Sequence, residues 1–310
     1  MRNQRSSIKI IKLLGVILTT GFVLLVIFNQ LVKNEQNETG LISPISDTIS
    51  FIVAPFKNNS LKNIVQDSLE GTKGTYGAVI KNLKTGDFYA INEHAVFETA
   101  SLYKIWVMAI VFDQIQNGEL KEDEELSEDI KVLNDKFNIS SESAELTEGT
   151  ITFTVNQALE QMITISHNYA SLLLTKKIKL SSVKTFLQKE GFDESTVGTD
   201  GGSPTSTPYD IALFFEKLYK GKLANPQDSN RMLGLLKRQK LNDKLPKYLP
   251  SGTIIAHKTG EIDSLTHDGG IVYGPKSDYI IVVLSESNSP AAAEERIADI
   301  SKKVYDYFEN

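Results

Sequence analysis

The chain has 310 residues, which is enough for two domains or for one domain with two lobes. Its 33 basic and 39 acidic side chains give a net charge of −6, and no basic stripe is present, which argues against nucleic acid as a partner. The absence of cysteine excludes disulfides, a thiol nucleophile and a cysteine-ligated metal site.

An apolar segment near the amino terminus predicts a membrane anchor. Residues 13–28 are apolar apart from two glycines and two threonines, and basic side chains but no acidic ones precede them. The positive-inside rule then keeps residues 1–12 in the cytoplasm. A cleaved signal peptide is the alternative, but no small-x-small cleavage site follows the apolar run. We therefore expect a single-pass transmembrane anchor over residues 13–33, a linker over residues 34–58 and an extracellular domain over residues 59–310.

The domain has strand patterns at both ends and helix patterns between them. It begins with a predicted helix over residues 60–69 and a β-hairpin over residues 76–91. Helical periodicity follows at residues 102–115, 155–164, 168–178, 181–190 and 208–218. The acidic stretch 118–149 is interpreted as a solvated loop. Strand patterns return at residues 253–257, 270–273 and 279–285, before a last helix over residues 291–308. This order predicts a sheet built from both ends and a helical lobe, about residues 100–220, inserted between them.

A serine and a lysine three residues apart open the first long helical pattern. On a helix, Ser101 and Lys104 would share one face. A serine is a poor nucleophile until a base removes its proton, and a lysine becomes such a base when burial destabilises its charge. The apolar residues 105–108 would bury the lysine stem. The same spacing recurs at Ser6–Lys9 and Ser181–Lys184, where a cytoplasmic flank and a helix cap are sufficient explanations.

Two further short motifs follow in the chain. The first, Ser166-His167-Asn168, lies between two predicted helices, where a helix cap is an equally good explanation. The second, Lys258-Thr259-Gly260, is expected at the end of the strand over residues 253–257. There a cation and a hydroxyl would hold a carboxylate, and the glycine would leave room for a ligand to approach the backbone. A strand end with a simple glycine turn is the alternative.

Taken together, the three motifs resemble the motif set of penicillin-binding proteins and class A β-lactamases. The segments 97–104 and 152–168 and the threonine-rich turn 205–208 are also similar to that family's sequences. The resemblance extends over residues 60–308, almost the whole domain. It implies an α+β, β-lactamase/transpeptidase-like fold, in which terminal helices flank an antiparallel sheet and a second lobe is all helical.

The resemblance also implies a role for each motif residue. Ser101 would attack an amide carbonyl and become acylated, with Lys104 as its base or as a member of the proton relay. Ser166 would pass a proton to the leaving nitrogen, and Lys258 would polarise the Ser166 hydroxyl. The backbone N–H groups of Ser101 and of Glu261 would form the oxyanion hole. The substrate-binding positions implied are Asn168, Thr259, Gly260 and Glu261.

The sequence departs from the family pattern at three places. The Glu-x-x-Leu-Asn pattern, whose glutamate activates the water that clears the acyl-enzyme, is absent from residues 191–203, where Glu194 is the candidate substitute. The arginine that the family often carries beyond Lys-Thr-Gly is missing, and His267, oriented by Asp268, is the candidate there; a capped turn is the alternative. His167 replaces an aspartate and is interpreted as a hydrogen-bonded structural residue.

These features predict a membrane-anchored serine hydrolase that hydrolyses β-lactam amides. The missing glutamate leaves two alternatives open: a D,D-peptidase or related cell-wall amidase with slow β-lactam deacylation, and a non-enzymatic penicillin-sensing or wall-binding module. The four histidines lack metal-ligand spacing, so we expect no metal and no cofactor. The expected partners are a β-lactam or a cell-wall peptide and the membrane, and we expect a monomer.

Overall fold

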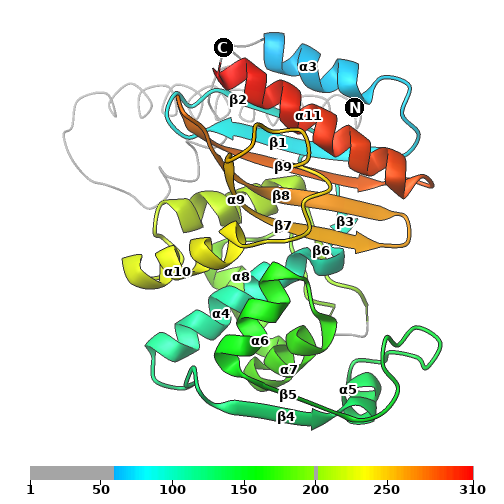
Figure 1. Cartoon of the computed structure of the whole chain (residues 1–310), viewed down its shortest axis with the longest axis vertical. Coiled ribbons are helices and arrows are strands. Elements are labelled where there is room, and N and C mark those ends of the chain that lie inside the picture. Colours follow the sequence, from blue (N-terminus) through cyan, green and yellow to red (C-terminus); the bar gives the residue numbers. More distant parts are fainter. Residues whose placement is uncertain (1–58, 199–201, 310) are drawn as a thin grey trace, which may run out of the picture. The chain divides into compact units, whose positions relative to one another are not determined.

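The computed structural model describes residues 59–198 and 202–309 (Figure 1). The predicted anchor and linker, residues 1–58, lie outside this part of the chain. None of the helices that the structure describes has both the length and the apolar character needed to cross a bilayer. The transmembrane segment at residues 13–33 therefore stays a prediction from the sequence.

An antiparallel sheet forms one lobe of the described residues. Its strands have the order β2-β1-β9-β8-β7. They are β1 (Thr75–Asn82), β2 (Phe88–Ile91), β7 (Ile254–Ile262), β8 (Leu265–Tyr273) and β9 (Asp278–Glu286). The strand β1, from the start of the domain, pairs with β9, from its end, so that Val79 lies opposite Val282. The chain between β2 and β7 is therefore free to form a second lobe.

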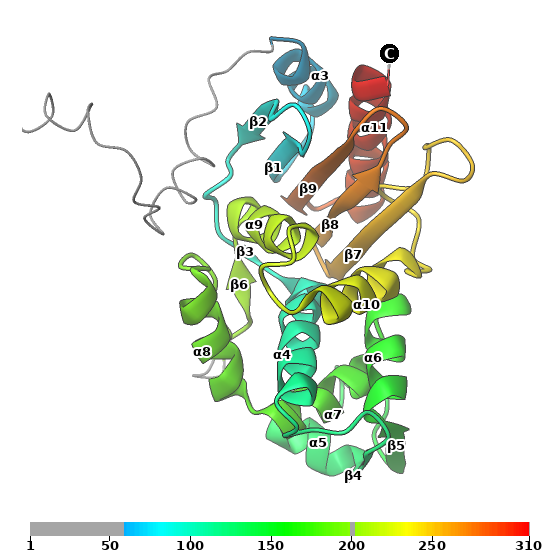
Figure 2. The same ribbon diagram turned by 90° about the vertical axis from the view of Figure 1, so that its left-hand side faces the viewer.

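Helices cover both faces of this sheet (Figures 1 and 2). Helices α3 (Asn59–Leu69) and α11 (Pro290–Glu309) lie side by side on one face. Alternate strand residues such as Ile80 and Ile281 point into the core beneath these helices. Helix α9 (Pro208–Tyr219) packs on the opposite face, with Pro208 in its first turn.

The helical lobe is built around α4 (Lys104–Gln116), which is buried from Lys104 to Phe112. A helix that is apolar on every side belongs in an interior, because it has no polar face to give to water. The helices that pack around it are α6 (Val155–Thr164), α7 (Asn168–Ile178), α8 (Leu180–Glu190) and α10 (Pro226–Lys237). The predicted α+β fold of an antiparallel sheet with helices is thus confirmed, although α10 was not predicted.

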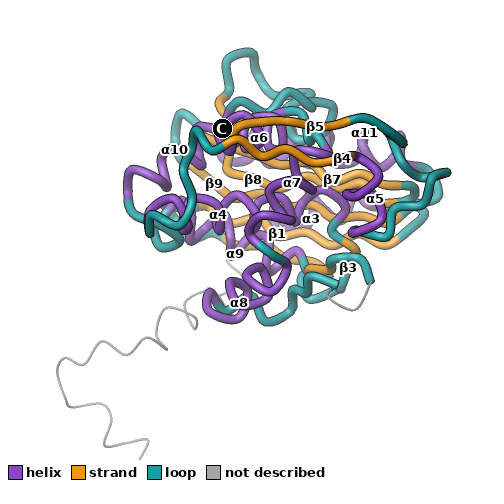
Figure 3. Tube along the Cα trace, turned by 90° about the horizontal axis from the view of Figure 1, so that it is seen from below, coloured by secondary structure: helices purple, strands orange, loops and turns teal. Residues whose placement is uncertain are grey.

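The interpretation of residues 118–149 as a loop is wrong in part. Strand β4 (Glu125–Asp129) pairs with β5 (Thr150–Thr154), and α5 (Ile130–Lys136) follows β4. Figure 3 shows this hairpin beside α6 and α7, the helices that it contacts. In β4, Leu126 is the buried residue, and Glu125 and Ser127 on either side of it are exposed. The hydrophobic alternation that would reveal a strand is therefore nearly absent from its sequence.

Strands β7 and β8 are longer than predicted. β7 continues beyond residue 257 through the Lys-Thr-Gly motif to Ile262, and β8 begins at Leu265 instead of residue 270. Gly260 pairs with His267 within this extension, so neither of the turns considered as alternatives for these two segments is formed. The glycines and polar residues of this extension have low strand propensity, but the pairing with neighbouring strands overrides that propensity.

Candidate active site

The three motifs meet where the sheet and the helical lobe adjoin. Ser101 lies in a 3-10 turn, η1 (Ala100–Tyr103), which passes directly into α4 at Lys104. Just before it, β3 (Phe97–Glu98) pairs with β6 (Thr205–Ser206), which joins the nucleophile segment to the threonine-rich turn. The turn η1 packs against β7, which carries Lys258, and the loop between α6 and α7 carries Ser166.

Lys104 is fully buried, and its ammonium group is directed at the second motif. Its Nζ donates hydrogen bonds to the Ser166 carbonyl oxygen (2.6 Å), to Ser166 Oγ (3.1 Å) and to Asn168 Oδ1 (2.7 Å). Burial lowers the pKa of Lys104 to about 7, against an opposing effect of the Glu145 charge. A substantial fraction of Lys104 is therefore neutral near pH 7, with a lone pair that can accept a proton.

Lys258 approaches the same serine from the sheet. Its Nζ donates to Ser166 Oγ (3.0 Å) and to the Thr259 carbonyl oxygen (2.8 Å). Full burial, followed by the nearby charge of Lys104, lowers the pKa of Lys258 well below its ordinary value. Ser166 Oγ thus accepts hydrogen bonds from two lysines, which leaves its own hydrogen available for donation.

Two non-glycine residues of the site have left-handed backbone conformations. Ala100, which immediately precedes Ser101, has φ 44°, and Ser166 has φ 59°. This region is unfavourable for residues with a Cβ and persists where the surrounding structure imposes it. The hydroxyls of Ser101 and Ser166 are therefore positioned by backbone segments whose conformation is imposed by the surrounding packing.

Gly260 has a different role from the predicted one. A Cβ at this position would meet the Thr99 carbonyl oxygen at 2.7 Å and Leu102 Cγ at 3.2 Å. The space beside its backbone is occupied by the protein's own nucleophile segment, and not by a ligand. The glycine is needed because η1 lies directly against β7.

The second motif combines a polar contact and a helix cap. Asn168, whose Oδ1 accepts from Lys104, donates from Nδ2 to Glu145 Oε1 at 2.5 Å. His167 Nδ1 accepts a hydrogen bond from the Ala170 backbone N–H and caps α7. Burial, more than any nearby charge, lowers the pKa of His167. The structure thus agrees with the interpretation of His167 as a structural residue.

The structure contradicts the suggestion that His267 replaces the missing arginine. His267 is fully buried; its Nε2 lies 2.8 Å from the Glu98 carbonyl oxygen, and its Nδ1 accepts from the Ser285 backbone N–H at 3.1 Å. Burial lowers its pKa to about 4, so the ring is neutral at pH 7 and offers no positive charge. Asp268 does not orient His267 either, because its carboxylate contacts His257 Nδ1 at 2.9 Å.

Glu194, the candidate deacylation base, is held away from the cavity that contains Ser101. Its carboxylate accepts a hydrogen bond from Thr207 Oγ1 (2.8 Å) and contacts His94 Nδ1 (2.8 Å). Its backbone N–H donates to the buried carboxylate of Asp210, on the first turn of α9 (3.0 Å). These contacts fasten the loop to α9, and Glu194 does not line the cavity.

Sequence analysis missed Glu145, which contacts Asn168, and it also missed Lys244. Lys244 is 1% exposed, forms an ion pair with Glu261, and its charge contributes to the lowered pKa of Lys258. Buried lysines are rare, and in the described part of the chain they are Lys104, Lys244 and Lys258, which all belong to this region. Lys244 precedes β7 in an irregular segment without a recognisable motif. Only the tertiary structure shows that a third buried lysine lies near Lys258.

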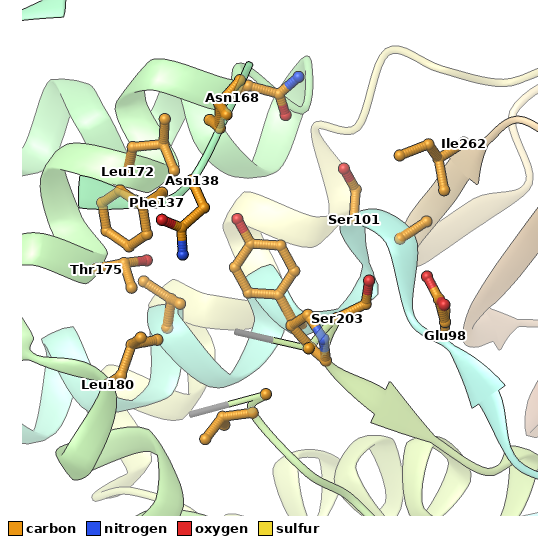
Figure 4. Close-up of a pocket in the computed structure, with 18 of the residues that line it drawn as sticks. Glu98, Ser101, Phe137, Asn138, Asn168, Leu172, Thr175, Leu180, Ser203 and Ile262 are labelled. Atoms are coloured by element: carbon orange, nitrogen blue, oxygen red, sulfur yellow. The ribbon is translucent and has the colours of Figure 1, made fainter. Parts of the chain in front are cut away.

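A cavity of about 720 Å³ opens beside Ser101 (Figure 4). Asn168 and Glu261 line it together with Ser101, so the cavity joins the nucleophile, the second motif and the end of β7. Glu98 and Glu145 also line it. Within the described residues, no group of histidine and carboxylate side chains is arranged to hold a metal ion. The arrangement is suited to acyl transfer by a serine, because the nucleophile Ser101 lines the cavity and two buried lysines meet at the hydroxyl of Ser166 in the adjoining motif.

Comparisons with known proteins agree with this geometry. The model of the beta-lactamase enzyme family matches residues 59–308. Beta-lactamase VEB-1 of Pseudomonas aeruginosa is 25% identical over 286 residues, which cover 85% of this chain and 94% of that protein. The structure of PBP-A is similar in fold, with a TM-score of 0.71 and 24% identity over 81% of this chain and 96% of that chain. A beta-lactamase from Sphaerobacter thermophilus DSM 20745 has a TM-score of 0.70 and 23% identity, over 80% and 96% of the two chains.

The family match includes all three motifs and confirms the resemblance found in the sequence. The solved structures, at these identities, support the fold alone. The two have nearly equal TM-scores, so the fold does not separate a beta-lactamase from PBP-A. The chain belongs to the beta-lactamase enzyme family and is a serine hydrolase that acts on amide bonds.

Proposed function

We propose that this protein is a membrane-anchored enzyme that works outside the cell, is acylated on Ser101 by β-lactams and hydrolyses them. One observation carries the proposal: Ser166 Oγ accepts hydrogen bonds from two buried lysines, Lys104 and Lys258. The partly exposed Ser101 lines the adjoining cavity. Ser101 precedes Lys104 by three residues, so the accessible nucleophile and the proton network lie about one helical turn apart.

Acylation moves one proton along this network. Neutral Lys104 takes the proton of the Ser101 hydroxyl as Oγ bonds to the amide carbon. The amide C–N bond then breaks, and Ser166 gives its hydrogen to the leaving nitrogen. Lys104 returns the proton to Ser166 across their 3.1 Å contact. The charge of Lys258 holds the Ser166 oxygen during the transfer and, with Thr259, attracts the substrate carboxylate.

The location rests on the sequence of residues 1–33. A bilayer-length apolar segment that follows a basic flank supports an anchor with its amino terminus inside. Because Ser101, Ser166 and Lys258 all come from one chain, the proposed enzyme needs no second subunit to complete its motif set, and we propose a monomer. Its partners are then the membrane and a β-lactam or a cell-wall peptide.

The test uses the chain without residues 1–34, mixed with a chromogenic cephalosporin. We expect product to form at a steady rate proportional to the enzyme concentration. Ser101→Ala removes the nucleophile, so its rate should fall to that of buffer. Equal turnover by both proteins would contradict acylation on Ser101.

A second candidate function is a D,D-peptidase. The observation that favours it is the position of Glu194, which Thr207 and His94 hold outside the cavity. Without a base for the second step, a β-lactam would release one equivalent of product and then stall, the fingerprint of a persistent acyl-enzyme. That burst, together with turnover of a peptide ending in D-Ala-D-Ala, would select the peptidase over the β-lactamase.

A further inference from the structure

The proposed hydrolysis needs a second proton acceptor once Ser101 has been acylated. Water attacks an ester efficiently when a base takes its proton, and such a base must reach the cavity beside Ser101. The two buried lysines that meet at Ser166 serve the first half of the proposed reaction, and Glu194 does not line the cavity. Within the described part of the chain, the carboxylates that line this cavity belong to Glu98, Glu145 and Glu261.

Two of these carboxylates are poorly placed to activate water. Glu261 forms an ion pair with the buried ammonium group of Lys244, and a neighbouring positive charge weakens a carboxylate as a base. Glu98 lies on β3, and Figure 4 shows it on the other side of Ser101 from Asn168, the position implied to bind the substrate amide. Neither residue thus combines an unpaired carboxylate with a place beside Asn168.

Glu145 has both of these properties. Its Oε1 accepts a hydrogen bond from Asn168 Nδ2 at 2.5 Å, and no residue that the structure describes donates a hydrogen bond to its Oε2. Asn168 Oδ1 in turn accepts from Lys104 Nζ at 2.7 Å, so one amide group joins the carboxylate to the proton network. Burial lowers the pKa of Lys104 and the charge of Glu145 opposes that shift, which shows that this carboxylate acts on the same site. Glu145 is exposed, so a water molecule can reach it.

The loop that carries Glu145 is fixed at the next residue by buried side chains. Leu146 donates from its backbone N–H to the Tyr169 hydroxyl (3.1 Å), and its carbonyl oxygen accepts from Asn134 Nδ2 (2.8 Å). The Tyr169 hydroxyl also lies 2.7 Å from this carbonyl oxygen. Tyr169 and Asn134 are 2% and 7% exposed, and Tyr169 directly follows Asn168 at the start of α7. The backbone beside Glu145 is therefore held against the helix that presents Asn168.

We propose that Glu145 is the general base of deacylation, which holds the attacking water molecule and takes its proton. The inference rests on the proposed function, because it assigns the second half of the same hydrolysis. The water oxygen bonds to the carbonyl carbon of the Ser101 ester as the proton passes to the Glu145 carboxylate. The bond between that carbon and Ser101 Oγ then breaks, and Glu145 returns the proton to Oγ. The acid product leaves, and both side chains regain their starting states.

The first experiment compares the wild-type full chain with Glu145→Gln, both in detergent at pH 8 with a chromogenic cephalosporin. The glutamine keeps an acceptor for Asn168 Nδ2 but cannot take a proton from water. Steady turnover should fall by about 10²- to 10⁴-fold, the usual contribution of a general base. The initial burst of one equivalent should keep a rate close to that of the wild type, because Lys104, with a pKa of about 7, is mostly neutral at pH 8 in both proteins. Mass spectrometry should show the acyl group persisting on Ser101 in the variant.

Two further variants separate Glu145 from the other carboxylates. Glu142→Gln is the matched control, since Glu142 belongs to the same loop, is exposed and does not line the cavity; its turnover should equal that of the wild type. Glu98→Gln removes the rival carboxylate on the other side of Ser101. A stall in Glu98→Gln, with turnover retained in Glu145→Gln, would overturn the inference.

Rescue by a small carboxylate distinguishes a base from a residue that only supports the loop. In Glu145→Ala, added formate can occupy the vacated space and take the proton of water, so steady turnover should rise with formate concentration. Ser101→Ala should gain nothing from formate. A structural role alone would leave the stalled Glu145→Ala protein insensitive to formate.

The outcomes also separate this inference from the proposed function. If the wild type and Glu145→Gln turn over equally, the inference is wrong and the proposed function stands. If the wild type itself releases one equivalent and stalls, both the base and the β-lactamase activity are excluded, while acylation of Ser101 remains. If the folded wild-type protein is never acylated, the proposed function fails and the inference fails with it.

Discussion

At the scale of single residues, the charge of Lys104 controls the proposed reaction. Lys104 is buried beside a second buried lysine, and both reach Ser166 Oγ. Lys104 uses all three of its ammonium hydrogens in hydrogen bonds to Ser166 and Asn168. When Lys104 loses a proton, one of these acceptor oxygens must therefore lose its hydrogen bond from Lys104. The neutral form is the one that can take the proton of Ser101.

The pH profile of acylation follows from these two lysines. Lys104 has a pKa of about 7 and must be neutral, so the second-order rate should fall about tenfold for each pH unit below 7. Lys258 must stay charged, and its pKa lies well below the ordinary value, so the rate should fall again at alkaline pH before 10.5. Burst kinetics with a β-lactam between pH 5 and 10 measure both limbs. A rate that is constant from pH 5 to 7 would contradict Lys104 as the base.

The charge of Glu145 should set the pH at which the acylation rate begins to fall on the acidic side of this profile. Its negative charge raises the pKa of Lys104, opposing burial. Glu145→Gln keeps an acceptor for Asn168 Nδ2 and removes the charge, so the limb should move to lower pH. Glu142→Gln in the same loop is the control, since Glu142 is exposed and does not line the cavity. The result to look for is a shift in Glu145→Gln alone; equal shifts in both variants would indicate a long-range charge effect.

At the scale of elements, the contact of η1 with β7 positions the nucleophile. The contact is possible because Gly260 lets the Thr99 carbonyl approach the strand. The turn η1 also follows β3, which pairs with β6. The nucleophile segment is thus held from both sides by backbone contacts.

Gly260→Ala should displace this turn. The added Cβ would meet the backbone oxygen of Thr99 at 2.7 Å, so η1 must move, and a displacement approaching 1 Å at a reacting group can cost about a hundredfold in rate. We expect kcat/KM to fall by about tenfold to a hundredfold while the far-UV circular dichroism stays native. In Gly234→Ala, on α10, the nearest atom lies 3.6 Å from the new Cβ, so activity should be retained. Full activity in Gly260→Ala would show that η1 tolerates the shift.

At the scale of the whole molecule, one chain joins a folded hydrolase to an apolar amino-terminal segment. The family match begins at residue 59, so residues 1–58 lie outside the matched region. The net charge of the chain is −6, yet its first 34 residues carry basic side chains and no acidic ones. The proposed orientation in the membrane rests on this asymmetry and on the positive-inside rule.

Fractionation of cells tests the proposed anchor. The full chain should sediment with membranes and leave them in detergent, because a segment of about 20 apolar residues partitions into lipid. The chain without residues 1–34, exported by a cleavable signal, should remain in the supernatant with unchanged specific activity. If protein expressed from the complete gene is recovered in the supernatant and begins near residue 33, the segment is a cleaved signal.

Much of the fold and part of the site could be predicted from local patterns. Helices α6 and α7 begin and end at the predicted residues, because caps and apolar periodicity coincide there. Strand β4 and helix α10 were missed. In β4, one residue is buried and most of the others are acidic, so the sequence shows no alternation of apolar and polar residues that would predict a strand. The strand is stabilised by its pairing with β5.

The sequence by itself determined the family, the α+β order of elements and the motif residues, since these depend on residue types at short separations. Only the tertiary structure decided what those residues can do. It buried Lys104 and lowered its pKa to about 7, and it brought in Lys244 from a segment without a motif. It also placed Glu194 outside the cavity and left His267 neutral. Burial and charge environment depend on contacts between segments far apart in the chain, and such contacts leave no local pattern.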